Sequence, residues 1–384
     1  MPSFQFQTVP QILSEAGSAR RLGAILAARF VPGRICVVTD SFLLDSGLLA
    51  PALSSLQEAG WTVHVVSDVQ ADPPDHVVEA IAARARSFEA EIVLGLGGGS
   101  SMDVAKLVAV LLASDQPLGA MYGIDQVTGG RLPLVQMPTT AGTGSEVTPI
   151  AIVTTGATTK SGIVARQLYA DMAILDAELT LGLPRAVTAA TGIDAMVHAI
   201  EAFTSKRLKN PLSDGLAVQA LQLLCGHLPE VCRNGHNSQA RQAMLLGALL
   251  AGQAFANAPV AAVHALAYPL GGRFHLPHGL TNALVLPHVL RFNAEAGAAH
   301  YAQLADALVP GCQGSAQDKT LAFIAHLEAL IAQTELPMRL RDHGVTEASL
   351  PQLAADAMLQ TRLLQNNPRE LTEVDALAIY RQAF

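Results

Sequence analysis

Four side chains in the second half of the chain have the types and spacing of a metal site. Asp194 and His198 lie four residues apart in an apolar, alanine-rich run, so a helix would place both on one face. His264 lies in another run of this kind, and His278 follows a proline where a helix is expected to begin. One carboxylate and three imidazoles suit a divalent first-row metal such as Fe(II) or Zn(II), whereas Ca²⁺ and Mg²⁺ prefer oxygen ligands. Separately hydrogen-bonded core histidines would give the same residue pattern.

A glycine-rich turn in the first half of the chain favours a second function, nucleotide binding. A buried strand is predicted over 91–96, leading into Gly97-Gly98-Gly99-Ser100 and a helix from 104 to about 113. Glycines let the backbone approach a phosphate, and a helix N-terminus offers free N–H groups to that anion. The run departs from the GxGxxG fingerprint, because Ser100 holds the last glycine position. A plain tight turn therefore remains an alternative.

Two further features favour a dinucleotide. Asp40 ends a predicted strand over 34–40. Its carboxylate would accept hydrogen bonds from a ribose 2′-hydroxyl and repel a 2′-phosphate, which favours NAD over NADP. The segment 138–146 follows a predicted strand over 132–137 and is rich in threonine, serine and glycine. Such residues suit contacts to pyrophosphate and the nicotinamide ribose, although a polar surface loop has the same composition.

The secondary structure predicted for the segments that carry these residues changes at Pro184. Before it, short β-like runs alternate with helical ones, which predicts a largely parallel α/β layer. From Arg185 onward the pattern is almost entirely helical. We therefore predict an α/β dinucleotide-binding domain over 1–184 and an all-helical metal-binding and catalytic domain over 185–384.

The remaining elements follow from periodicity. In the first domain we expect a strand over 61–66, a helix over 76–88 and short β-rich pieces near 150–154 and 173–175. In the second we expect helices over 186–204, 213–232, 238–257, 260–270, 279–292, 299–309 and 318–333, with weaker ones near 347–358 and 372–382.

Composition bounds the class of protein. The 384 residues are 50% hydrophobic and 15% charged, with a formal net charge of −8 and no Lys/Arg run, which gives no support for binding nucleic acid or an anionic membrane. No uninterrupted apolar run reaches about 18 residues, so no membrane span is expected. The N-terminus lacks a secretory pattern, and the four cysteines form no CxxC. We expect a cytoplasmic protein whose partner is a small molecule.

Four motifs resemble one known family, the iron-containing alcohol dehydrogenases. They are GGGSSMDVAK (97–106), PTTAGTGSEVT (138–148), TGIDAMVHAIEAF (191–203) and HALAYPLGGRFHLPHGLTNALVLPH (264–288). The similarity runs in matching order from about residue 30 to about 300. It implies that family's fold, also seen in dehydroquinate synthase: an α/β dinucleotide-binding domain followed by an all-helical domain. A homodimer or higher homo-oligomer is expected.

The resemblance also implies roles for individual residues. The iron ligands would be Asp194, His198, His264 and His278. Pyrophosphate contacts would come from Gly97, Gly98, Gly99, Ser100 and Asp103. Contacts to the rest of NAD would come from Asp40, Thr139, Thr140, Thr143 and Lys160.

The chain departs from the family's pattern at two positions. Many members carry a histidine four residues after the third ligand, often assigned to a proton relay, where this chain has Tyr268. Tyr268 is expected to face the site, because it lies one helical turn after His264. Asp72 stands where relatives often have asparagine near the adenine-side ribose.

His275 is interpreted as a rim histidine, with a role behind His278 as the alternative.

We therefore expect an NAD-dependent, iron-containing alcohol dehydrogenase that moves a hydride between a short alcohol and its aldehyde or ketone. The metal would act as a Lewis acid on the substrate oxygen. A dehydroquinate synthase-like lyase or cyclase that uses NAD transiently is the first alternative, disfavoured because few Lys or Arg residues flank the ligands. A non-catalytic nucleotide- or metal-binding protein is the second, disfavoured by the intact ligand set.

Overall fold

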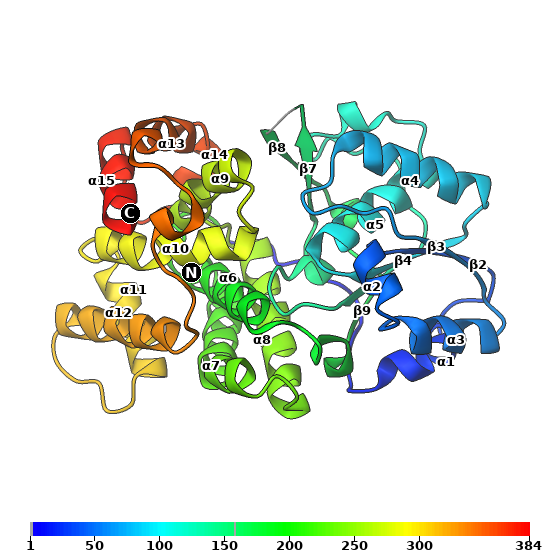
Figure 1. Ribbon diagram of the computed structural model, residues 1–384, viewed down its shortest axis with the longest axis horizontal. Coiled ribbons are helices and arrows are strands. Elements are labelled where there is room, and N and C mark those ends of the chain that lie inside the picture. Colours follow the sequence, from blue (N-terminus) through cyan, green and yellow to red (C-terminus); the bar gives the residue numbers. More distant parts are fainter. Residues whose placement is uncertain (1–2, 157–158) are drawn as a thin grey trace. The chain divides into compact units, whose positions relative to one another are not determined.

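The computed structural model describes residues 3–156 and 159–384 and divides into two compact units (Figure 1). One unit covers Thr8–Gly182, and the other covers Leu183–Phe384 together with the described N-terminal residues up to Gln7. Those first residues join the helical unit because the Asn257 amide binds the Gln7 backbone twice: Gln7 N donates to Oδ1 at 2.7 Å, and Nδ2 donates to the Gln7 carbonyl at 2.8 Å. The α/β unit therefore covers Thr8–Gly182, whereas the range predicted from the sequence was 1–184.

The first unit is built on a parallel sheet, as predicted. Its six strands lie in the order β1-β9-β6-β4-β2-β3, and every pairing within it is parallel. They cover Ile12–Ser14 (β1), Arg34–Val38 (β2), Thr62–Val66 (β3), Ile92–Gly97 (β4), Leu134–Pro138 (β6) and Met172–Leu175 (β9). A smaller three-stranded sheet, in the order β5-β8-β7, contains Gly123–Ile124 (β5), Ile150–Thr155 (β7) and Thr159–Val164 (β8).

Burial explains why these segments form interior strands. All six residues of β4 are buried, and so are the last four of β2, as expected for parallel strands covered on both faces. The helices of this unit are Leu22–Ala27 (α1), Ser41–Asp45 (α2), Ala50–Glu58 (α3), Asp75–Ser87 (α4) and Gly99–Leu112 (α5). Gly95 lets α5 approach β4, because a Cβ there would lie 2.9 Å from the Cβ of Ala105 and 2.0 Å from Gln136 Oε1.

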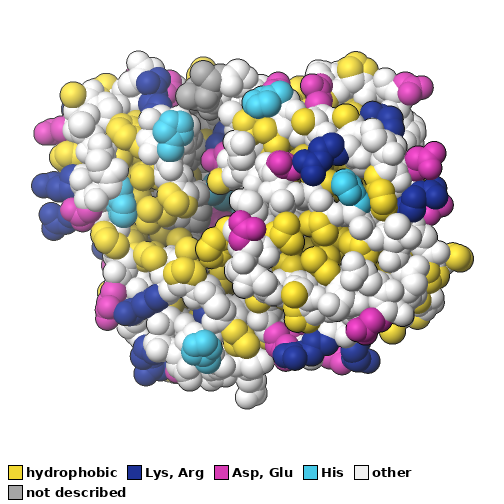
Figure 2. Space-filling model, turned by 45° about the vertical axis from the view of Figure 1, so that its right-hand side comes forward, with side chains coloured by type: hydrophobic (Ala, Val, Ile, Leu, Met, Phe, Trp, Pro, Cys, Tyr) yellow, Lys and Arg dark blue, Asp and Glu magenta, His cyan; other side chains and the backbone are white. Residues whose placement is uncertain are grey.

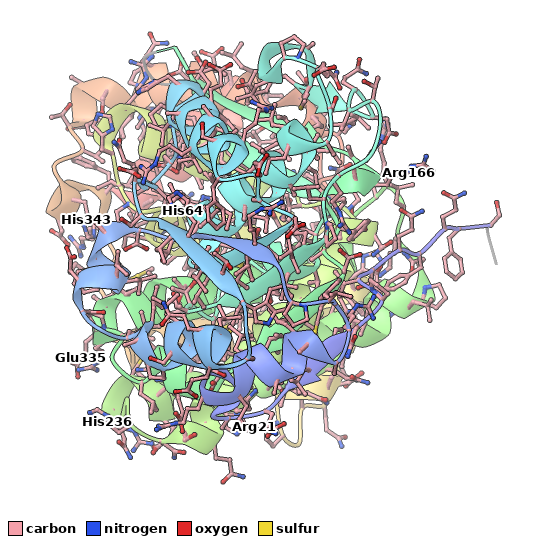
Figure 3. All side chains as sticks on the ribbon, turned by 90° about the vertical axis from the view of Figure 1, so that its right-hand side faces the viewer. Arg21, His64, Arg166, His236, Glu335 and His343 are labelled. Carbon is pink, nitrogen blue, oxygen red and sulfur yellow. The ribbon has the colours of Figure 1, made fainter. Side chains whose placement is uncertain are left out.

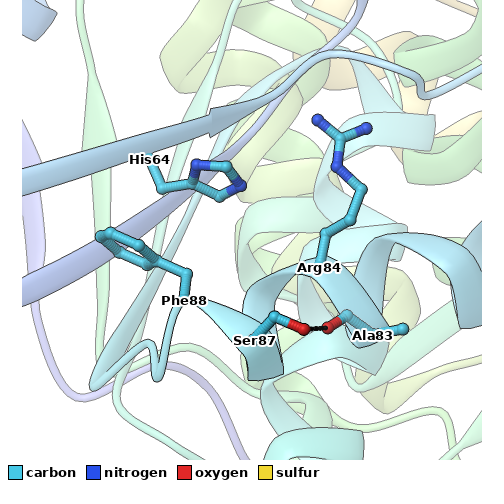
Figure 4. A pocket seen from close by; sticks show the side chains of 5 residues that line it. All are labelled: His64, Ala83, Arg84, Ser87 and Phe88. Carbon is cyan, nitrogen blue, oxygen red and sulfur yellow. Dashed lines mark hydrogen bonds between the residues drawn. The ribbon is translucent and has the colours of Figure 1, made fainter.

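Strand β3 forms one edge of the large sheet, next to α4. Five residues line a shallow depression here: His64, Ala83, Arg84, Ser87 and Phe88 (Figure 4). The His64 ring stacks on Phe88 with a centroid separation of 4.9 Å, and Figure 3 shows this side of the sheet with His64 labelled. The depression contains none of the residues predicted to bind metal or nucleotide.

The second unit is helical, as predicted. Its helices cover Arg185–Thr204 (α6), Pro211–Arg233 (α7), Ser238–Asn257 (α8), Ala262–Phe274 (α9), His278–Asn293 (α10), Ala298–Leu308 (α11), Ala316–Ala332 (α12), Leu350–Met358 (α13), Thr361–Leu364 (α14) and Glu373–Ala383 (α15). Helix α6 is buried along most of its length and packs against α7, α8 and α10. A helix apolar on all sides belongs at the centre of a bundle, so polar groups on α6 are buried as well.

Among the described residues, no single helix has both the length and the apolar character needed to cross a membrane. Helices α8 and α9 meet those criteria only as a pair that is bent by 105°. Figure 2 shows side chains of both charge signs interspersed over one face of the molecule, without a large patch of a single sign.

Candidate metal centre and nucleotide site

Three helices bring the predicted metal ligands together. Asp194 and His198 lie one turn apart on α6, His264 is in the first turn of α9, and His278 is the first residue of α10. Gly279 lets α10 begin close to α6, because a Cβ at this position would lie 2.6 Å from the backbone oxygen of Ala190. The predicted helical spacing and the predicted helix start at His278 are thus both present.

The donor atoms of the four side chains converge on one point. One ligand atom from each residue lies within 4.8 Å of the others. Asp194 Oδ1 is 4.0 Å from His198 Nε2, 3.9 Å from His264 Nε2 and 3.7 Å from His278 Nε2. These separations exceed a hydrogen bond, so the nitrogen atoms surround the oxygen without bonding to it. Such a buried cluster has the donor set and the spacing to hold a small cation.

Electrostatics favour a charged Asp194. Burial by itself raises the pKa of this carboxyl, but His198, His278 and His264 and the amide of Asn282 outweigh burial, so its pKa lies below the usual value. The carboxylate therefore remains ionised near neutral pH and available to a cation.

Glu201 holds His264 in the orientation that the cluster needs. Its Oε2 accepts a hydrogen bond from His264 Nδ1 at 2.7 Å, which leaves Nε2 of that ring facing the other donors. The same carboxylate accepts from the backbone N–H groups of Ala261 and Val263 at 2.9 and 2.7 Å, at the start of α9. Glu201 is 4% exposed, so these bonds lie in a low-dielectric interior where they are strong.

Asn282 lies one turn after His278 on α10 and is fully buried. Its Nδ2 is 2.5 Å from Asp194 Oδ1 and 3.3 Å from Nε2 of both His264 and His278. One amide therefore contacts three of the four candidate ligands.

Aromatic rings line the cluster. The ring of Phe255 stacks on His198 with a centroid separation of 4.3 Å. The ring of Tyr268 lies 6.5 Å from that of His264 and 5.9 Å from that of His278, as expected for a residue facing the site. The His278 side chain is 32% exposed, against 2–5% for the other three ligands. The site therefore opens to solvent beside His278.

His275 does not join this cluster. It is exposed, ends α9 and adopts a left-handed backbone conformation with φ of 54°. This arrangement fits the interpretation of His275 as a rim histidine.

The glycine turn of the first unit is open at the end of β4. Gly98 is the N-cap of α5, and a Cβ there would meet its nearest neighbour, Thr140, only at 3.9 Å. Gly99 is instead pressed against Thr143, since a Cβ would lie 2.7 Å from its methyl group. Thr139 N donates to the Gly97 carbonyl at 3.0 Å, which joins the 138–146 loop to the turn. The start of α5 and this loop thus form one polar cradle at the N-terminus of a helix, where backbone N–H groups lack partners within the helix.

Asp103 has a structural place behind this cradle. Its Oδ1 accepts from Ser145 Oγ at 2.6 Å, and its Oδ2 accepts from Ile152 N at 2.9 Å. Lys106, which is fully buried, donates to Ser145 Oγ and to the Ile150 carbonyl at 2.7 Å each and lies 3.5 Å from Asp103. Burial lowers the pKa of Lys106, and Asp103 opposes that effect. The pair fastens α5 to the loop and to β7.

Other predicted nucleotide contacts lie around the same cradle or at strand ends. Asp40 follows β2, is partly exposed and caps α2 by accepting from Leu43 N at 2.9 Å. Lys160 forms an ion pair with Asp72, and Asp72 N donates to Ser100 Oγ at 3.3 Å. Lys160 and Asp72 are thereby linked to the first turn of α5.

Glu201, Asn282 and Lys106 were not identified from the sequence as site residues. Each carried a positional signal: Glu201 follows His198 by three residues, Asn282 follows His278 by four, and Lys106 follows Asp103 by three. These three residues share one pattern, a charged or amide side chain within an apolar helix, and a search for that pattern would have identified them.

Comparisons with known proteins agree with this architecture. Residues 10–177 match the model of the iron-containing alcohol dehydrogenases, and residues 188–384 match that of the C-terminal domain of the Fe-containing alcohol dehydrogenase family. Long-chain-alcohol dehydrogenase 1 of Geobacillus thermodenitrificans is 41% identical, over 98% of this chain and 92% of that protein. The crystal structure of a 1,3-propanediol oxidoreductase is 35% identical with a TM-score of 0.95, over 100% of both chains.

A sulfoacetaldehyde reductase from Bifidobacterium kashiwanohense, solved in complex with NAD+, is 29% identical with a TM-score of 0.88, over 100% of this chain and 99% of that one. These names are those of dehydrogenases and reductases, and they do not favour a lyase or a non-catalytic protein. Both units match, and a relative aligns over nearly the whole length. The chain therefore belongs to the iron-containing alcohol dehydrogenase family.

Proposed function

We propose that Asp194, His198, His264 and His278 hold a catalytic iron ion with which this enzyme moves a hydride between an alcohol and NAD+. In the reverse direction it would reduce the aldehyde or ketone with NADH. The observation that carries the proposal is the convergence of one carboxylate oxygen and three imidazole nitrogens within 4.8 Å in the helical unit.

The residues present fit a divalent transition metal. Imidazole and carboxylate donors suit Fe(II) and Zn(II), and Asp194 carries a negative charge that an ion would neutralise. Glu201 accepts the Nδ1–H of His264, an arrangement typical of metal-binding histidines. When bound, the ion supplies a Lewis acid that favours the alkoxide form of an alcohol. The partly exposed His278 marks the side from which a substrate oxygen approaches.

For the cofactor, we propose that the N-terminal turn of α5 holds the NAD pyrophosphate. The support is chemical: Gly98 is the N-cap of the 14-residue helix α5, and Gly99 and Ser100 lie in its first turn, where backbone N–H groups at the positive end of a helix attract an anion. Gly97 ends β4 directly before this turn. Asp103 lies behind this turn with both oxygens engaged, so we assign it to positioning α5 rather than to contact with an anion.

The other proposed NAD contacts flank this turn. Asp40, at the end of β2, would accept from the adenosine ribose. The 138–146 loop and the three-stranded sheet supply the remaining proposed NAD contacts, which are Thr139, Thr140, Thr143 and Lys160.

Within this class of alcohols, aldehydes and ketones, the substrate that we favour is a primary alcohol or its aldehyde. The similar proteins are named for a long-chain alcohol, 1,3-propanediol and sulfoacetaldehyde. The rings of Phe255 and Tyr268 beside the candidate ligands provide apolar surface, which favours an uncharged substrate. We also propose a cytoplasmic location, which suits four free cysteines, and a homodimer or higher homo-oligomer, testable by light scattering.

Metal analysis with a turnover assay tests the proposal. His264→Ala and His278→Ala each remove one of four ligands and should abolish both tight metal binding and NADH formation from primary alcohols. His275→Asn is the matched control, since Asn tolerates the left-handed backbone and His275 lies outside the cluster. Chelation should inactivate the native enzyme, with Fe(II) restoring more activity than Mg(II). A ligand variant that kept a full metal equivalent and native turnover would refute the site, and transient reduction of NAD without net NADH would favour the lyase.

A further inference from the structure

We propose that Asn282 is a fifth metal-facing group, and that its amide oxygen sets the preference of this site for Fe(II) over Zn(II). The inference rests on the proposed function, because it requires an ion held by Asp194, His198, His264 and His278. It concerns a different residue and a different property, the choice of metal.

The first support is position. Asn282 Nδ2 lies 2.5 Å from the oxygen of Asp194 and 3.3 Å from the metal-facing nitrogens of His264 and His278. Glu201, by contrast, contacts His264 on the far side of the ring, at Nδ1. The Asn282 amide therefore reaches the donor atoms themselves rather than supporting a ligand from behind.

The second support is an unsatisfied atom. Among the residues that the structure describes, Asn282 Oδ1 is buried and has no hydrogen-bond partner. A buried carbonyl oxygen without a partner is destabilising, because it loses its hydrogen bonds to water and gains none in the protein. Half a turn about the last side-chain bond exchanges the two ends of the amide and directs Oδ1 at the ligand cluster.

The charge of the ion decides which end of the amide faces it. A cation attracts the carbonyl oxygen and repels the N–H hydrogens. Conversely, an amide oxygen next to the Asp194 carboxylate is unfavourable unless a cation lies close to both. The oxygen-inward orientation therefore goes with metal binding, and it satisfies the atom that is otherwise unpartnered.

An additional oxygen donor has a predictable effect on metal choice. Structural and catalytic zinc sites keep about four ligands in total, with nitrogen and sulfur favoured. Five protein donors, two of them oxygens, suit an ion that accepts a larger coordination number. Asn282 thus favours Fe(II) through its oxygen, whereas the four other ligands alone would also suit Zn(II).

Cobalt substitution tests this without relying on turnover. Co(II) absorbs visible light strongly in four-coordinate sites and weakly in sites with more ligands. Asn282→Leu should strengthen the Co(II) absorption and lower the Fe(II)/Zn(II) affinity ratio about tenfold or more, as measured by competition. Asn282→Asp keeps an oxygen at this position and should keep the weak absorption. Asn293→Leu, a buried asparagine on the same helix that pairs with Asn367, is the matched control and should leave both readouts native.

The outcomes separate this inference from the proposed site. If native protein bound no Co(II), or if His264→Ala still bound it, the site itself would be wrong. If native protein bound one equivalent and Asn282→Leu kept the native spectrum and affinity ratio, Asn282 would not be a metal-facing group. A tighter Fe(II) affinity in Asn282→Leu would also overturn the inference, because the amide would then compete with the ion. If the leucine variant does not fold, Asn282→Ser, whose hydroxyl is too short to reach, replaces it with the same expectations.

Discussion

Glu201 on α6 accepts a 2.7 Å hydrogen bond from His264 on α9, and so one carboxylate joins the two helices that carry three of the four candidate ligands. The same side chain fixes the first turn of α9 through two backbone N–H groups. Metal affinity and helix position are therefore coupled at Glu201.

The first prediction concerns this coupling. Glu201→Gln keeps the shape of the side chain but removes the charge that accepts the Nδ1–H of His264, so metal affinity should fall roughly 10- to 100-fold. Isothermal titration of the apo-protein with Zn(II) measures the change. Glu146→Gln, another buried glutamate far from the ligands in sequence and in the other unit, should retain native affinity. Equal affinities in native protein and Glu201→Gln would show that Glu201 has no such role.

The second prediction concerns the cofactor. Asp40→Ser should raise KM for NAD and improve the use of NADP, because it removes an acceptor for the 2′-hydroxyl and a charge that repels a 2′-phosphate. Serine is chosen over glycine since Asp40 also caps α2, and Ser keeps that hydrogen bond to Leu43 N. Steady-state kinetics with both cofactors measure the ratio of kcat/KM. An unchanged ratio in a variant of native thermal stability would exclude Asp40 from cofactor discrimination.

The third prediction concerns Tyr268. Its ring lies 5.9 Å from the ring of His278, where a hydroxyl can orient a water or a substrate. Tyr268→Phe should lower kcat roughly tenfold or less, in line with loss of one hydrogen bond, while metal content stays native. A phenol with a reference pKa near ~10 is a poor proton store at neutral pH, whereas imidazole titrates near ~6.5. Tyr268→His should therefore introduce a pH dependence of kcat near the imidazole pKa.

Two results in which a variant behaves like the native enzyme would count against a role for Tyr268. They are a Phe variant with unaltered kcat and KM, and a His variant with an unaltered pH profile. Together they would mean that the ring of Tyr268 only fills space.

The fourth prediction concerns stability and pH. Burial raises the pKa of Glu146 to about 7 from its usual 4.5, although its own backbone N–H and Lys106 oppose the shift. A raised pKa means that the native state holds this proton more tightly than the unfolded chain. The contribution of Glu146 to stability is therefore fully present below about pH 4.5 and is lost as the pH rises towards 7.

Urea unfolding at pH 5 and pH 8 measures this effect. Glu146→Gln, which cannot ionise, should lose less stability between these pH values than the native protein does. The exposed Glu91 of the same unit provides the control, and Glu91→Gln should keep the native pH dependence. If native protein and Glu146→Gln showed the same loss, Glu146 would not titrate in this interval.

Local pattern predicted many of the elements and nominated the candidate ligands, but it missed others, among them helices α1 and α3 and strand β1. The sequence predicted β4, because it is a short apolar run followed directly by glycines. It also predicted that Asp194 and His198 share one face of a helix, because residues four apart lie about one helical turn from each other. The change from alternating to helical patterns predicted a domain boundary at Pro184, and the two compact units of the structure divide after Gly182. That the histidines at 264 and 278 would join Asp194 was implied by family resemblance, not by spacing.

Only the tertiary structure decided what surrounds those ligands. Glu201 lies on the same helix as His198, but its partner is the ring of His264, 63 residues away in sequence. Asn282 reaches Asp194 across 88 residues, because Gly279 permits α10 to start against α6. Hydrogen bonds of this kind depend on how helices pack, and packing depends on volumes and close approaches summed over the whole core. Periodicity along one segment contains no information about these hydrogen bonds. The sequence by itself therefore determined which residues could bind a metal, and the tertiary structure determined how those residues are held.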